Sequence, residues 1–64
     1  MDNGKKYLTP TELVERWDGA IGKGTLANWR AQGRGPGYVK IGGRVLYPVE
    51  AVAEYEQQNR RGAA

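Results

Sequence analysis

Five residues near the middle of the chain, Gly33-Arg34-Gly35-Pro36-Gly37, limit its possible folds more than any other feature. They cannot continue a helix, because proline lacks a backbone N–H and glycine is costly to order. The segment is therefore predicted to be a loop. It divides a chain of 64 residues, long enough for one domain with a thin core, into two parts of different character.

The part before the loop opens with a strong helix signal. Thr9-Pro10-Thr11-Glu12 offers a capping threonine, a proline at the first helical position and a glutamate that completes a capping box. This pattern predicts a helix from Pro10 to Trp17 or Asp18. Leu13 and Trp17 belong to its apolar face, which should pack into the core.

A second helix is predicted from Lys23 to Gln32, after a short turn. Gly22 is its expected N-cap and Gly33 its expected left-handed stop. Leu26 and Trp29 lie three residues apart on one side, so Trp29, like the first tryptophan, is assigned to the core. Two short helices joined by a brief turn are typical of a helix-turn-helix.

The part after the loop alternates in the manner of strands. Residues 38–41 and 44–47, separated by Gly42-Gly43, predict a β-hairpin. A last helix is expected from Pro48 to about Arg60, with Val52 in its apolar stripe. The predicted fold class is therefore α+β: a small winged helix-turn-helix with a two-stranded hairpin as the wing and a C-terminal helix.

The length of the hairpin tip decides which side chains share a face. A two-residue tip would put Val45 on the face of Lys40. A three-residue tip, Gly42-Gly43-Arg44, would instead pair Ile41 with Val45 and gather the apolar residues on one face. The alternation favours the three-residue tip, with Lys40 pointing outward.

Charge is distributed very unevenly along the chain. None of the seven acidic residues lies between Gly19 and Val49, whereas five cations do, so this stretch has a charge of +5 in a chain of net charge +3. A solvated surface explains the cations but not the absence of acids over half the chain. A polyanionic partner explains both, which favours nucleic acid.

The second helix offers side chains suited to reading bases in a major groove. Arg30 could bind guanine through two hydrogen bonds, Asn28 could bind adenine, and Thr25 could touch either kind of base. Lys23 is expected to contact a phosphate, because phosphate contacts position a protein on DNA. The plainer interpretation is an ordinary polar helix face, which often contains such residues.

The hairpin and the loop before it supply the remaining candidates. Arg44, at a slim glycine tip, suits a narrow minor groove, and Tyr38 could offer its hydroxyl to a phosphate. The alternative for Arg44 is a solvated turn residue. The full set of predicted DNA-binding residues is Lys23, Thr25, Asn28, Arg30, Arg34, Lys40 and Arg44.

Composition argues against other classes of function. The chain has no cysteine and no histidine, so disulfides and the usual metal ligands are missing, and no cofactor or enzyme activity is expected. No apolar run is long enough to span a membrane, which predicts a cytoplasmic protein. The domain is expected over residues 7–60, with residues 1–6 and 61–64 disordered.

Three stretches together resemble a known family: Thr25-Leu26 with Trp29-Arg30, Gly33-Arg34-Gly35-Pro36, and the hairpin residues 39–45 with Tyr47. They are similar to excisionases (recombination directionality factors) and AlpA-like regulators, which have a MerR-type winged helix-turn-helix. The resemblance covers about residues 7–59. It implies an accessory protein that binds attachment-site DNA as several copies, bends it and directs a separate integrase toward excision.

The sequence departs from the family pattern at three positions. Gly22 replaces a frequent serine cap, Leu46 a basic residue and Ala51 an acidic one. Two functions compatible with the same fold remain open: a transcriptional regulator of a prophage promoter, and the DNA-recognition domain of a small terminase subunit. A protein-interaction module, acting through Leu46 and the last helix, is the alternative from a different class.

Overall fold

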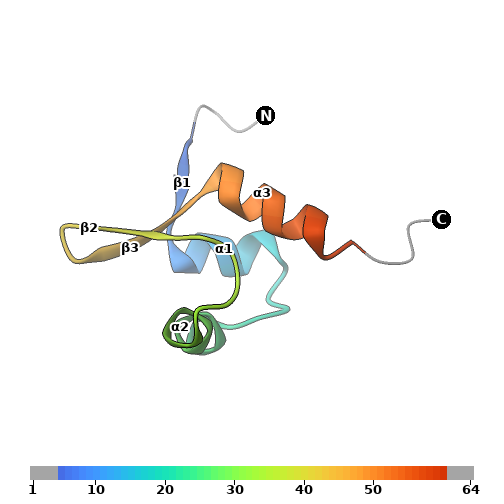
Figure 1. The fold of residues 1–64 in the computed structure, drawn as a ribbon, viewed down its shortest axis with the longest axis horizontal. Coiled ribbons are helices and arrows are strands. Elements are labelled where there is room, and N and C mark those ends of the chain that lie inside the picture. The colour runs from blue at the N-terminus through green and yellow to red at the C-terminus, as the bar shows by residue number, and fades with distance from the viewer. Residues whose placement is uncertain (1–4, 61–64) are drawn as a thin grey trace.

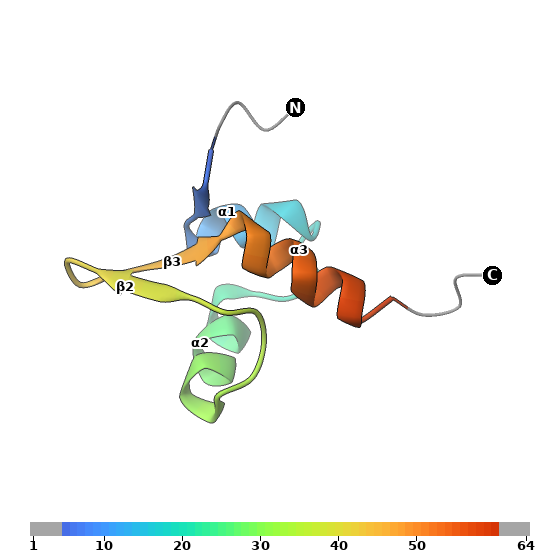
Figure 2. The same ribbon diagram turned by 45° about the horizontal axis from the view of Figure 1, so that its top comes forward.

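The structure is a computed structural model that describes residues 5–60, so the predictions for residues 1–4 and 61–64 lie outside it. The fold is an α+β winged helix-turn-helix, as the sequence predicts (Figure 1). The hairpin projects away from the helices, and α2 lies below it in both ribbon views (Figures 1 and 2). The elements, in order, are β1 (Tyr7–Leu8), α1 (Pro10–Arg16), α2 (Lys23–Gln32), β2 (Val39–Ile41), β3 (Arg44–Pro48) and α3 (Val49–Gln58).

Helix α1 begins at the predicted capping box. The Thr9 hydroxyl accepts a hydrogen bond from the Glu12 backbone N–H at 3.1 Å, and the Glu12 carboxylate accepts one from the Thr9 N–H at 2.9 Å. The helix ends at Arg16, followed by Trp17 as its C-cap. Asp18 then adopts a left-handed conformation with φ of 56°, which turns the chain toward α2.

Helix α2 begins and ends where the glycines predict. Gly22 is extended at its N-terminus, and Gly33 is left-handed at its C-terminus with φ of 72°. The loop that follows folds back on the helix. A Cβ atom at Gly35 would lie only 2.6 Å from Cε3 of Trp29, so this position requires glycine for its close approach and for its φ of +88°.

The two hairpin strands belong to a three-stranded antiparallel sheet of order β1-β3-β2, in which β3 is the central strand. Tyr7 pairs with Pro48 and Leu8 with Tyr47. This β1 pairing is an addition that the local pattern did not predict. Lys5 and Lys6, which the sequence placed before the domain, contact it: the Lys5 amine pairs with Glu12, and the Lys6 carbonyl accepts a hydrogen bond from Val49 at 2.9 Å.

The predicted three-residue tip is wrong. Ile41 pairs with Arg44 and Lys40 with Val45, so the tip contains only Gly42 and Gly43. Both glycines have positive φ, 58° and 81°, as a type I′ turn requires, and such a turn matches the twist of the strands. Lys40 therefore lies on the face of Val45, not on the opposite one.

The core is small and takes one fully buried side chain from each of four elements. Leu13 of α1, Leu26 of α2, Tyr47 of β3 and Val52 of α3 are each at most 1% exposed. The two tryptophans were predicted to be core. They pack against this cluster but are only partly buried. Their open sides line a groove of about 490 Å³ between the α1–α2 turn and α3, together with Ile21, Tyr55, Asn59 and Arg60.

Candidate nucleic-acid interface

The outward face of α2 is unusually smooth. At about 100° per residue, the side opposite the buried Leu26 carries five exposed residues: Gly24, Ala27, Asn28, Ala31 and, at the end of the helix, Gln32. Asn28 and Gln32 are the two of them with polar side chains. A helix with so few protruding atoms can approach the floor of a groove closely. The three small residues carry no chemical signal in the sequence and were not predicted, although their spacing could have revealed this face.

Two predicted contact residues flank that face on different sides. Thr25 is exposed on the side toward Trp29. Lys23 is exposed on the other side and lies seven residues, about two turns, before Arg30, so these two cations share the side of α2 nearer the hairpin. The helix therefore presents a neutral polar face with a cationic border.

Arg30, predicted to read guanine, is half-buried and turned toward the hairpin. Its Nη1 donates a hydrogen bond to the Tyr47 hydroxyl at 2.7 Å. Its Cζ lies 5.8 Å from the ring centroid of Tyr38 and 6.0 Å from that of Tyr47. These contacts tie the last turn of α2 to the base of the wing.

The two wing cations lie on opposite faces of the hairpin because the tip has two residues. Lys40 is exposed on the face of Val45 and the buried Tyr47, which is the face toward α2. Arg44 is exposed beside the tip, on the other face with Ile41, its cross-strand partner. The structure thus brings Lys40 to the side of α2 and separates Arg44 from it.

Arg34, the remaining candidate, lies just past the end of α2. It is exposed, and its guanidinium lies 5.4 Å from the ring centroid of Trp29. Its backbone N–H bonds to the Trp29 carbonyl at 2.8 Å. Arg34 is therefore placed at the C-terminal end of α2, away from the hairpin tip.

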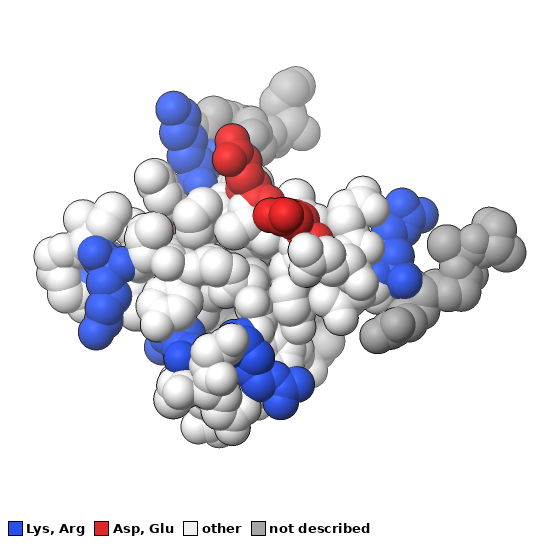
Figure 3. Space-filling view, viewed as in Figure 1, with Lys and Arg blue, Asp and Glu red and all other residues white. Residues whose placement is uncertain are grey.

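Charge of opposite sign is segregated in space as well as in sequence. On the face shown in Figure 3, basic side chains lie over α2 and the hairpin, whereas the acidic side chains gather over α3. Further basic side chains lie near β1 and at the end of α3. Glu50 and Glu54 are the exposed acids of α3. In the electric field of a polyanion, such a distribution turns the face that carries α2 and the wing toward that polyanion.

The acidic side chain of Glu56 instead joins α3 to α1. It accepts hydrogen bonds from Arg16 Nε at 2.8 Å, from Arg16 Nη2 at 3.0 Å and from Trp17 Nε1 at 2.6 Å. The Arg16 bonds, and then the Trp17 bond, hold the pKa of Glu56 below its ordinary value against the opposing effect of burial. The same partnership raises the pKa of Arg16. These bonds fix the scaffold that supports α2.

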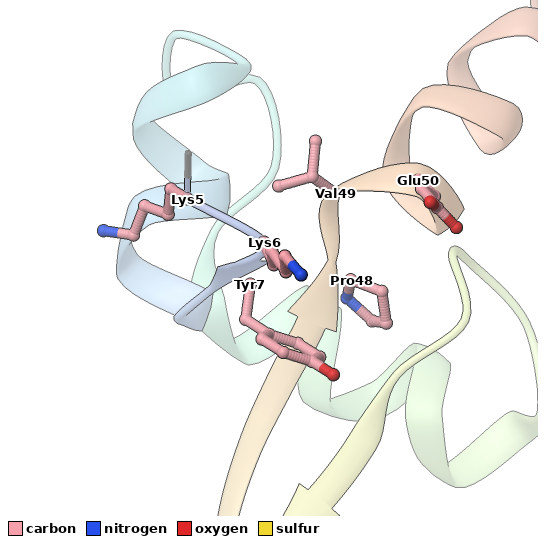
Figure 4. A pocket seen from close by; sticks show the side chains of 6 residues that line it. All are labelled: Lys5, Lys6, Tyr7, Pro48, Val49 and Glu50. Atoms are coloured by element: carbon pink, nitrogen blue, oxygen red, sulfur yellow. The ribbon is translucent and has the colours of Figure 1, made fainter. Parts of the chain in front are cut away.

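A hollow of about 300 Å³ lies between β1 and the start of α3, at the opposite end of the molecule from α2. It is lined by Lys5, Lys6, Tyr7, Pro48, Val49 and Glu50 (Figure 4). The Lys5 amine points away from it and pairs with Glu12. Within residues 5–60, no three metal-ligating side chains gather, and no helix is long and apolar enough to cross a membrane.

The arrangement of α1, α2, hairpin and α3 defines a winged helix-turn-helix protein. Residues 20–60 match a protein family described as a helix-turn-helix domain, which is well over half of the chain. The chain belongs to this family. A helix-turn-helix domain is a module for binding DNA rather than for catalysis. Searches of curated proteins and of solved structures found no significant match.

Proposed function

We propose that this chain is an excisionase-type architectural protein, which binds attachment-site DNA, bends it and directs an integrase toward excision. The observation that carries the DNA-binding part is the smooth face of α2 around Asn28, beside a slim wing, within a stretch from Gly19 to Val49 that has no acid. The resemblance of the α2 and hairpin residues to excisionases supports the finer assignment.

In this proposal α2 enters the major groove. Asn28 and Thr25 read base edges, and Lys23 contacts a phosphate at the start of the helix. Arg44, on the outer face beside a tip of two glycines, reaches the flanking minor groove, where a narrow groove attracts a single guanidinium. Arg34 contacts the backbone at the far end of the helix.

A single domain of this size has few contacts with which to define a unique site. Several copies are therefore proposed to bind neighbouring sites cooperatively, with an integrase as the protein partner. Bending would bring distant integrase sites together, at a cost that the added protein contacts offset.

Selection of duplexes from a randomised pool, followed by fluorescence anisotropy, tests the binding mode. Asn28→Ala is expected to weaken binding to the selected duplex by about 5- to 150-fold, corresponding to about 1–3 kcal/mol. Its effect on binding to a scrambled duplex should be small. Gln57→Ala, exposed on α3, is the matched control and should change neither. Equal losses on both duplexes for Asn28→Ala would contradict the reading role of α2.

A second candidate, a transcriptional regulator of a prophage promoter, uses the same fold and the same residues. An excision assay with the integrase and its attachment-site DNA separates the two. Stimulated excision together with a bent DNA complex is expected. Repression of a promoter without any effect on excision would favour the regulator instead.

A further inference from the structure

The angle between α2 and the hairpin contains a polar cluster that the reading of bases does not explain. From α2 come Arg30 and Lys23, which share one side of the helix. From the hairpin come Tyr38 and Lys40. Lys40 lies on the face of Tyr47, and the Tyr38 ring lies 6.2 Å from the Tyr47 ring, centroid to centroid. All the charged members are cationic.

Arg30 is held in this angle rather than extended along the helix face. Tyr47, which fixes its Nη1, is only 1% exposed, so its hydroxyl depends on this bond inside the protein. If the Arg30 guanidinium moved to bind a guanine, the Tyr47 hydroxyl would lose its hydrogen-bond partner. The cost of that unsatisfied buried hydroxyl would offset the new base contact. The observed position is therefore the one that Arg30 is expected to keep on DNA.

The held guanidinium still has donors to offer. A guanidinium has five N–H groups, and in the described part of the chain Arg30 uses one of them, toward Tyr47. The ring of Tyr38, a residue 42% exposed, has its centroid 5.8 Å from Cζ of Arg30, so a side chain that carries a hydroxyl borders the guanidinium. The Arg30 guanidinium, the Tyr38 hydroxyl and the exposed Lys40 amine are donors on three separate side chains, and such a set suits the several oxygens of one phosphate.

We infer that Arg30, Tyr38 and Lys40 form a binding site for one phosphate of the DNA backbone, and that Arg30 positions the protein instead of reading sequence. The inference rests on the proposed DNA binding and makes it more specific. The two faces of the wing then contact different parts of the DNA. The face toward α2 binds the backbone beside the major groove, and Arg44 on the other face binds in the minor groove. Asn28 and Thr25 then determine which base sequence the protein prefers.

Arg30→Gln tests the inference on the intact chain, with the selected and the scrambled duplexes. Binding to both is expected to fall by the same factor, about tenfold, and the slope of log K against log salt to become shallower by about 1. A loss confined to the selected duplex, or a changed base preference at one position in a new selection, would overturn the inference. Equal binding of Arg30→Gln and the unaltered protein would also overturn it.

Neutral methylphosphonate linkages, placed one at a time in the selected duplex, locate the phosphate. At one position the linkage should weaken the unaltered protein about tenfold but leave Arg30→Gln unaffected, because the contact is already lost. The absence of any such position would overturn the inference. Tyr38→Phe, which keeps the ring over Arg30, should lose part of the same effect, and circular dichroism verifies that each variant is folded.

The outcomes separate this inference from the proposal on which it rests. A protein that binds no duplex at all would overturn the proposed function and the phosphate site together. If Asn28→Ala shows that the protein reads the selected duplex, but Arg30→Gln weakens binding to the selected duplex alone, only the phosphate site is overturned.

Discussion

Single side chains join distant parts of this chain because its core is too small to do so alone. Glu56 lies 39 and 40 residues from the two donors that it satisfies, Trp17 and Arg16. Arg30 likewise reaches 17 residues to Tyr47. Neither partnership could be predicted from the sequence, because local spacing says nothing about which surfaces of two helices will face each other.

Replacing Glu56 with glutamine should destabilise the domain in a pH-dependent way. Its pKa is lowered in the folded state, so its stabilisation is fully present above the ordinary carboxyl value of 4.5 and is lost as the pH falls through the lowered value. The side chains of Arg16 and Glu56 are 37% and 34% exposed, so screening limits the loss at pH 7 to about 1 kcal/mol. The melting temperature should fall by about 4–8 °C.

Thermal melts from pH 7 to pH 3 check this expectation, since the variant and the unaltered protein should converge as the carboxyl becomes protonated. Glu54→Gln, an exposed position on the same helix, removes one charge without removing these bonds and is the control. A constant difference across the whole pH range would show that the charge of Glu56 is not the cause.

Two glycines should respond in opposite directions to replacement by alanine. At Gly35 a methyl group would meet the Trp29 ring at 2.6 Å, on a backbone with φ of +88°. Strain and overpacking together should cost about 2–4 kcal/mol.

At Gly24, inside α2, nothing lies within 4 Å of the added atom, so alanine should stabilise the helix by about 1 kcal/mol. Melting temperatures without DNA measure both, and a stabilised Gly35→Ala would contradict the close packing described for the loop.

At the level of elements, the sequence predicted what local signals define. The capping box at Thr9 gave the start of α1, and Gly22 and Gly33 gave the bounds of α2. The register of the hairpin was missed because apolar residues occur on both of its faces, so alternation alone could not choose. The decisive factor was the pair of left-handed glycines at its tip. Strand β1 was missed because two residues carry no periodicity, and their partners in β3 are 41 and 39 residues away.

Gly42→Asn tests the tip directly. In a type I′ turn the first tip residue has positive φ, 58° here, which asparagine tolerates better than other side chains, and Asn-Gly is a favoured pair. Asparagine also restricts the unfolded chain, so a gain of about 0.5 kcal/mol is expected. A rise in melting temperature of about 2–4 °C would fit, whereas a clear fall would argue against the two-residue tip. Gly43→Val, β-branched at φ of 81°, should destabilise.

For the whole molecule, the separation of charge predicts a strong dependence of DNA binding on salt. With four to five phosphates neutralised, log K should fall against log salt with a slope of about −4. Anisotropy titrations between about 50 and 200 mM salt measure it. Lys40→Ala should weaken the selected and scrambled duplexes alike and reduce the slope by about 1. A slope near zero would contradict binding through these cations.

The four-residue core has one more consequence. Because Leu13, Leu26, Tyr47 and Val52 come from α1, α2, β3 and α3, none of these four elements can detach without opening the core. Helix α2 and strand β3 of the wing therefore share one folding equilibrium with α1 and α3. A ligand that binds only the folded form adds about 2.7 kcal/mol at a hundredfold excess over its dissociation constant, a large addition for a domain this small. Bound DNA would then raise the folded population of this chain and lengthen its lifetime against proteases.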